Sequence, residues 1–180
     1  MPLGAARFGF QSGKSFIEAT GGNAINTYTE GGVNYKAHVF TASGNFVVSS
    51  LGSDGATQIL LVAGGGSAGG GNDDPNSAGG GGAGAYVIDT LTFSSIGTYP
   101  IVIGAGGAQV SHANVGNQGN SSQIQAIGGG SNLKQGNGGG RGADPGGVGG
   151  NSGDPNGGSG GGSGGTNTGT SSGGSKGNNG

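Results

Sequence analysis

The sequence predicts an all-β protein in which a small antiparallel β-sandwich carries an array of extended, polyglycine-II-like glycine helices, with little or no α-helix. Three observations predict this class. Short apolar segments are separated by turn residues, as in small all-β domains. Residues 1–37 show no helical periodicity. Glycine makes up 52 of the 180 residues, which is far above average usage.

The first predicted strands lie in residues 38–63. Residues 38–42 (HVFTA) and 46–48 (FVV) read as strands that flank the turn residues 43–45, so we expect a hairpin. Residues 57–63 (TQILLVA) form a continuous apolar run with β-branched residues and end at a glycine. This pattern favours a fully buried strand over a helix.

Three more strands are predicted between the first glycine-rich insertion, residues 64–84, and the tail. Residues 85–93 alternate, with Val87, Leu91 and Phe93 on one side, where Asp89 interrupts the apolar face. Residues 98–103 contain Pro100, which predicts an edge strand or a strand start. Residues 123–127 are expected to be the last strand. Short strands at this spacing indicate a sandwich, residues 38–127.

The tail, residues 128–180, has 25 glycines in 53 residues and no aromatic residue, so it cannot build a hydrophobic core. Each ordered glycine costs roughly 0.5–1 kcal/mol relative to alanine, which main-chain hydrogen bonds would have to offset. We therefore expect extended helices of about three residues per turn, packed side by side. A flexible linker is the alternative. A collagen repeat is excluded because residues 149–153 break its register.

Asp-Pro turns interrupt the glycine-rich runs at three places, and we interpret them as points where the chain reverses between neighbouring helices. They are Asp73, Asp74, Pro75 and Asn76, then Asp144 and Pro145, and then Asp154, Pro155 and Asn156.

The composition argues against several classes of function. Only 8% of the residues are charged and the net charge is −2, so a nucleic-acid-binding surface is not expected. The sequence has no run of 18 apolar residues, the length that a membrane-spanning helix needs, so membrane insertion is not expected. The low charge suits a component of a larger assembly better than a free monomer, and we expect a homo-oligomer, specifically a trimer.

The chain offers little for catalysis or for binding a metal or cofactor, so none of these is expected. It has two histidines, His38 and His112, and no cysteine, although a triad assembled in space stays an alternative. Residues 13–15 (GKS) lack the earlier glycine of a phosphate loop. Residues 139–144 match a calcium-binding repeat only once, and Asp73 with Asp74 lacks a third ligand.

The order of strands and glycine blocks resembles a known family. The matching segments are residues 40–46 (FTASGNF), 57–66 (TQILLVAGGG), 79–86 (GGGGAGAY), 99–107 (YPIVIGAGG) and 121–130. They resemble the glycine-rich domain of bacteriophage tail fibres and tail-tip adhesins over about residues 38–180. The opening residues 1–10 (MPLGAARFGF) also look like the start of small structural proteins of marine phages.

The resemblance implies a virion protein, located on the extracellular particle, whose glycine-rich tip contacts a host cell-surface receptor through the Asp-Pro turns. Residues 1–37 would then be an arm that binds other virion proteins, with Arg7, Phe8 and Phe10 as candidate attachment residues. Family members end in a short apolar strand that is not seen before Gly180, which suggests a longer polypeptide. A purely structural decoration protein and, less favoured, an ice-binding glycine-helix bundle are the alternatives.

Overall fold

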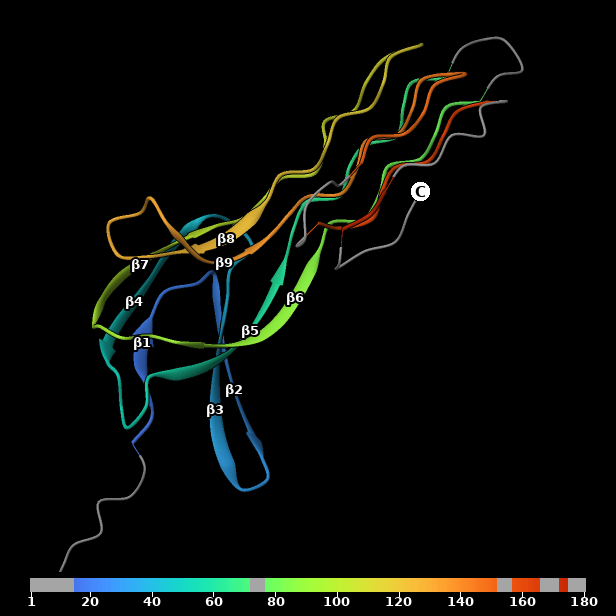
Figure 1. The fold of residues 1–180 in the computed structure, drawn as a ribbon. Helices are drawn as coiled ribbons and strands as arrows, with labels where there is room; N and C mark the ends of the chain where they lie inside the picture. The colour runs from blue at the N-terminus through green and yellow to red at the C-terminus, as the bar shows by residue number, and fades with distance from the viewer. Residues whose placement is uncertain (1–14, 72–76, 152–156, 166–171, 175–180) are drawn as a thin grey trace, which may run out of the picture.

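The computed structural model describes residues 15–71, 77–151, 157–165 and 172–174, and within these ranges the chain forms nine β-strands and no helix (Figure 1). The predicted all-β class is confirmed. The strands are β1 (Glu18–Thr20), β2 (Ala24–Glu30), β3 (Val33–Val39), β4 (Gly44–Ser50), β5 (Ala56–Val62), β6 (Tyr86–Thr92), β7 (Gly97–Val102), β8 (Ser122–Gln125) and β9 (Asn132–Gly136).

Two antiparallel sheets pack on each other as a sandwich. One has five strands in the order β1-β4-β7-β8-β9, and the other is the pair β5–β6. Side chains from both sheets form one buried cluster, in which the Phe93 ring lies 4.5 Å from the Tyr99 ring and 5.5 Å from the Phe46 ring, centroid to centroid. The buried members are Ala19, Val48, Leu61, Val87, Leu91, Phe93, Tyr99, Ile101 and Ile124.

Strands β2 and β3 form a separate hairpin that projects from the sandwich (Figure 1). The predicted pairing of residues 38–42 with 46–48 is therefore wrong, because β3 pairs with β2 while β4 pairs with β1 and β7. The decisive turn is Gly31-Gly32, where φ is 58° and 78°. Two successive positive φ angles favour a two-residue hairpin turn, and glycine adopts them without steric cost.

The strand predicted over residues 57–63 is confirmed as β5, but it is not fully buried. Leu60 is 66% exposed and Val62 is 57% exposed, while Leu61 between them is buried. The reason is that β5 pairs only with β6, and this two-stranded sheet is covered by the core on one face. In β6 the predicted alternation is confirmed, since Val87 and Leu91 point into the core.

Two further details differ from the expectation. Pro100 lies in β7, a central strand, but β8 pairs only with Ile101 and Val102, so no ladder bond on that side requires an N–H at residue 100. The chain also forms β9 after the expected last strand, and β9 pairs with β8 across the turn at 126–131. Residues 132–136 thus belong to the sandwich.

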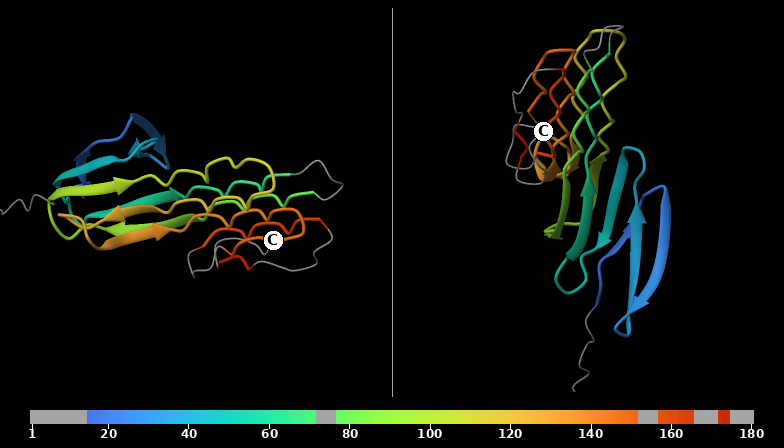
Figure 2. Two further views of the ribbon diagram at one scale, coloured as in Figure 1. Left: turned by 90° about the horizontal axis from the view of Figure 1, so that it is seen from above. Right: turned by 90° about the vertical axis from the view of Figure 1, so that its right-hand side faces the viewer.

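Glycine-rich segments from four parts of the chain extend away from the sandwich and run side by side (Figure 2). They are residues 63–71, 77–85, 104–120 and the described part of 137–165, so the array draws on the insertion and the 104–120 loop as well as the tail. These segments bond to one another through their main chains, at N···O distances of 2.6–3.2 Å.

The hydrogen bonds of the array repeat every third residue. Between 64–70 and 114–120, the N–H groups of Gly64, Ser67 and Gly70 bind the carbonyls of Asn120, Asn117 and Asn114. Gly66 and Gly69 of the same segment bind Gly82 and Gly79 in another segment. A β-strand has a side-chain period of two, whereas extended helices have three residues per turn. The three-residue spacing of the hydrogen bonds is consistent with the predicted polyglycine-II-like helices. The helix type itself stays a prediction.

The close approach of these segments requires glycine. A Cβ atom on Gly69 would lie 1.8 Å from the carbonyl oxygen of Ala143, and one on Gly138 would lie 1.8 Å from that of Gly119. Both distances are far below any real contact. Main-chain bonding and the absence of side chains therefore depend on each other in the array, because only chains this close can pair their amides directly.

Candidate functional site

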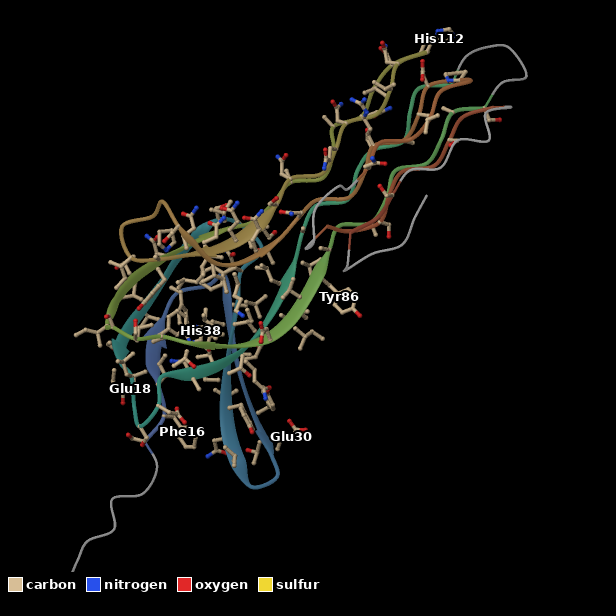
Figure 3. All side chains as sticks on the ribbon, viewed as in Figure 1. Phe16, Glu18, Glu30, His38, Tyr86 and His112 are labelled. Atoms are coloured by element: carbon tan, nitrogen blue, oxygen red, sulfur yellow. The ribbon has the colours of Figure 1, made fainter. Side chains whose placement is uncertain are left out.

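The end of the array furthest from the sandwich gathers turns from distant parts of the sequence, as the position of His112 in Figure 3 shows. Ala113 N–H donates to Gly71 O at 3.2 Å, and Gly164 N–H donates to Gly147 O at 2.9 Å. Gly165 N–H donates to Ser77 O at 2.6 Å. These bonds hold the turns on a rigid support, an arrangement that suits recognition.

One of these turns, Ser111–Asn114, was not among the predicted contact residues. Its residues are exposed, and Ala113 has a φ of 57°, a left-handed conformation that a non-glycine residue adopts only at some cost. The Asn114 side chain closes the turn, because its Nδ2 donates to the carbonyls of Ser111 and His112, each at 3.1 Å. From the sequence, His112 was considered only as one of the two histidines. Asn114 two residues later was the available turn signal.

The turn at Asp144 and Pro145 is the one predicted contact turn that the structure describes. Gly147 N–H donates to Asp144 O at 3.0 Å and closes the turn, which confirms the predicted chain reversal there. Both residues are partly buried. The other predicted contact and attachment residues lie outside the described residues: Arg7, Phe8, Phe10, Asp73, Asp74, Pro75, Asn76, Asp154, Pro155 and Asn156.

A polar groove of about 320 Å³ lies on the side of the array. Gly116 N–H donates to Gly142 O and Gly150 N–H donates to Arg141 O, so the segment that carries Arg141 runs between the two walls. Gly150 leaves room for the arginine stem, since a Cβ there would lie 2.6 Å from Arg141 Cγ. The groove is lined by Gly116, Asn117, Gln118, Arg141, Gly150 and Asn151.

The groove offers both hydrogen-bond donors and hydrogen-bond acceptors. Arg141 is exposed, and no other described residue forms an ion pair with its guanidinium. The Asn117 side chain donates through Nδ2 to Ala108 O at 2.9 Å, so its Oδ1 can accept a hydrogen bond from a ligand. Asn151 uses Oδ1 to accept from Ser172 N–H at 2.7 Å, which leaves its Nδ2 donors. Such a set can bind a polar or anionic ligand.

The described residues show no arrangement for metal chemistry. They contain no cluster of three or more histidine, aspartate or glutamate side chains placed to hold an ion. His38 holds the base of the hairpin against the sandwich, because its Nδ1 donates to Gly21 O at 2.7 Å and its ring meets the Phe46 ring edge-on at 5.2 Å. In the same part of the chain there is no helix long and apolar enough to span a membrane.

Comparison with known proteins gives a family for the chain. No curated protein and no solved structure matches it significantly. A family model described as a glycine-rich domain matches residues 41–180, which include the sandwich strands from β4 onward and all the segments of the array. Because the match covers most of the sequence, the chain belongs to the glycine-rich domain family.

Proposed function

We propose that the chain is a structural protein of a bacteriophage virion, a tail-fibre or adhesin component that presents the glycine-rich array to the host surface. Support comes from the resemblance of its strand and glycine blocks to tail adhesins and from its membership of the glycine-rich domain family. The observation that carries the proposal is the array itself, which projects from the sandwich (Figure 2) and carries the exposed turn at residues 111–114 at its far end.

In this proposal the two ends of the molecule have different roles. Residues 1–37 bind other virion proteins, with Arg7, Phe8 and Phe10 as attachment residues, and copies associate as a trimer. The distal turns, together with the groove at Arg141, contact the host receptor. Main-chain bonds stiffen this support, so that a receptor-binding turn loses little entropy on binding.

Adsorption of particles to host cells tests the recognition role. We expect His112→Ala and Arg141→Ala, both at exposed positions of the array, to reduce adsorption by about tenfold if each removes roughly 1.4 kcal/mol of binding free energy. Ile96→Ala, at an exposed position of the loop after β6 in the sandwich, is the control and should leave adsorption unchanged. Normal adsorption of both array variants would favour the alternative, a decoration protein without a receptor.

Two measurements address the remaining alternatives. Electron cryomicroscopy of the particle would locate the chain at the tail tip if it is an adhesin and on the capsid if it is a decoration protein. Thermal hysteresis of the purified chain should be absent. Measurable hysteresis would instead support ice binding.

A further inference from the structure

The outer face of the β5–β6 sheet carries a continuous apolar surface. Leu60 lies opposite Ile88 and Val62 lies opposite Tyr86, all four on the face that points away from the core. Their exposed fractions are 66%, 71%, 57% and 59%. We call these four residues the β5–β6 face. Tyr86 is labelled on it in Figure 3.

This surface is large for a monomer. If a fully exposed large side chain offers about 200 Å², the four residues expose on the order of 500 Å², near the upper end of the largest apolar patch on ordinary monomers. The flanking residues on the same face are uncharged: Ala56, Gln58, Thr90 and Thr92. A partner could therefore cover the face without burying an unpaired charge.

The projecting hairpin has a second surface of the same kind. Tyr28 lies opposite Tyr35, and their rings stack at a centroid distance of 5.1 Å and an interplanar angle of 13°. Val39 is on the same face, and the three side chains are 49%, 38% and 38% exposed. We call Tyr28, Tyr35 and Val39 the tyrosine face. The opposite face of the hairpin turns toward the sandwich at its base, where His38 contacts Gly21 and Phe46.

The hairpin also lacks the contacts that usually stabilise one. All seven residues of β2 are exposed, and among the described strands β2 and β3 pair only with each other. A two-stranded hairpin is at best marginally stable in water. The hairpin therefore needs a covering surface, just as the β5–β6 face does.

We propose that the two surfaces are the two halves of one interface between copies of this chain: the tyrosine face of one copy packs on the β5–β6 face of the next. Both are two-stranded antiparallel sheets with strands of seven residues. Packed face to face, they would cover about 750 Å² of apolar surface, which with their polar flanks approaches the roughly 1,000 Å² of a specific interface.

A second copy is favoured over an unrelated partner because one contact covers both surfaces, whereas packing of two identical β5–β6 faces leaves the tyrosine face in water. A contact between two different surfaces closes into a ring when the rotation allows it. This inference rests on the proposed self-association and gives it a surface. It assigns no role to the distal turns.

Light scattering coupled to gel filtration tests the interface on the full chain. The unaltered chain should have three times the 16.7 kDa mass of one copy. Leu60→Thr/Ile88→Thr, which alters the β5–β6 face, and Tyr28→Thr/Tyr35→Thr, which alters the tyrosine face, should each be monomeric. Threonine keeps a high strand propensity, so both variants are expected to fold. Far-UV circular dichroism and amide protection of the core would verify it.

Two exposed isoleucines serve as matched controls. Ile96, in the loop after β6, is 62% exposed, and Ile25, on the other face of the hairpin, is 48% exposed. Ile96→Thr and Ile25→Thr should leave the mass unchanged. If either control dissociates the assembly as fully as the face variants do, the interface is not the one proposed.

Mixing the two double variants tests whether the contact joins the tyrosine face of one copy to the β5–β6 face of another. Each retains the half that the other lacks, so the mixture should form a 1:1 complex of twice the single-copy mass, which neither variant forms alone. A monomeric unaltered chain overturns the interface, and so does a Tyr28→Thr/Tyr35→Thr variant that stays oligomeric through identical β5–β6 faces. A dimeric unaltered chain that both variants dissociate supports the interface and refutes only the trimer.

Discussion

Two adjacent glycines allow a direct test of how the array is held together. Gly79 is buried: its N–H donates to Ala143 O at 3.0 Å, and a Cβ on it would lie 1.9 Å from Gly162 O. Gly80 is exposed, and a Cβ there would meet nothing within 4 Å. Gly79→Ala and Gly80→Ala therefore make the same chemical change in the same segment and differ only in what the methyl group meets.

The expected cost at Gly79 follows from the geometry. Cβ atoms essentially never approach within 3.0 Å of another atom, so the segment with Gly162 must move by about 1 Å. That segment is held by Ala143 N–H to Gly162 O at 3.1 Å and by Gly162 N–H to Gly80 O at 2.7 Å. A shift of that size breaks or strongly weakens both bonds. With roughly 1–3 kcal/mol for each of the two bonds lost, Gly79→Ala should cost about 2–6 kcal/mol.

Gly80→Ala should have the opposite sign. Alanine restricts the unfolded chain, so the variant is expected to be as stable as the unaltered protein or up to about 1 kcal/mol more stable. Amide hydrogen exchange measures both effects locally. In Gly79→Ala, protection should fall at Ala143 and Gly162 and persist at Val48 in the sandwich core. Equal protection in the two variants would refute the argument that close main-chain packing stabilises the array.

Two further predictions concern side chains of the sandwich. Ser122 is fully buried, and its Oγ donates to Val62 O at 2.7 Å while accepting from Gly104 N–H at 2.9 Å; Ser122→Ala should lower the free energy of unfolding by about 1–3 kcal/mol, measured by urea denaturation. Lys134 and Asp89 form an ion pair whose side chains are 29% and 46% exposed; Lys134→Gln should cost less than about 1 kcal/mol, and a larger loss in the same assay would show that solvent does not screen the pair.

The strands were predictable where a local pattern decided them. The alternation in residues 85–93 and the apolar run in 57–63 identified β6 and β5, because the buried faces of strands leave a period of two in the sequence. Pairing was harder to predict, since β4 joins β1 and β7 through contacts between distant residues. The Gly31-Gly32 turn was the readable hairpin signal, whereas Ser43, Gly44 and Asn45 resemble a hairpin turn without joining two paired strands.

The glycine-rich segments could be recognised as bonded through their main chains, but not assigned to neighbours. Glycine has no side chain that prefers one partner over another, so a run of glycines carries no information on register. The turn at Asp144 and Pro145 was predictable from its local Asp-Pro signal, and their contact role stays a prediction. Arg141 could not be related to Asn117 and Asn151 from sequence, because main-chain bonds between three segments bring them together.

The structure indicates where that missing register comes from. Val62 pairs with Tyr86 at the end of the β5–β6 sheet, and the pairing continues into the array as Ala63 N–H to Ala85 O, Gly66 N–H to Gly82 O and Gly69 N–H to Gly79 O. The partners change from neighbouring residues to every third residue, but the two chains stay together.

The same continuation occurs at β8 and β9. Ser122 pairs with Gly136 in the sheet, and Gly119 N–H then donates to Gly139 O in the array. Side chains such as Val87 and Ile124, buried in the core, decide which residues face each other in the strands, and a slip by one residue would move them to the wrong face. The sandwich thus sets the register that the glycines cannot specify. The array then propagates it outward, so that turns far apart in sequence meet at its distal end.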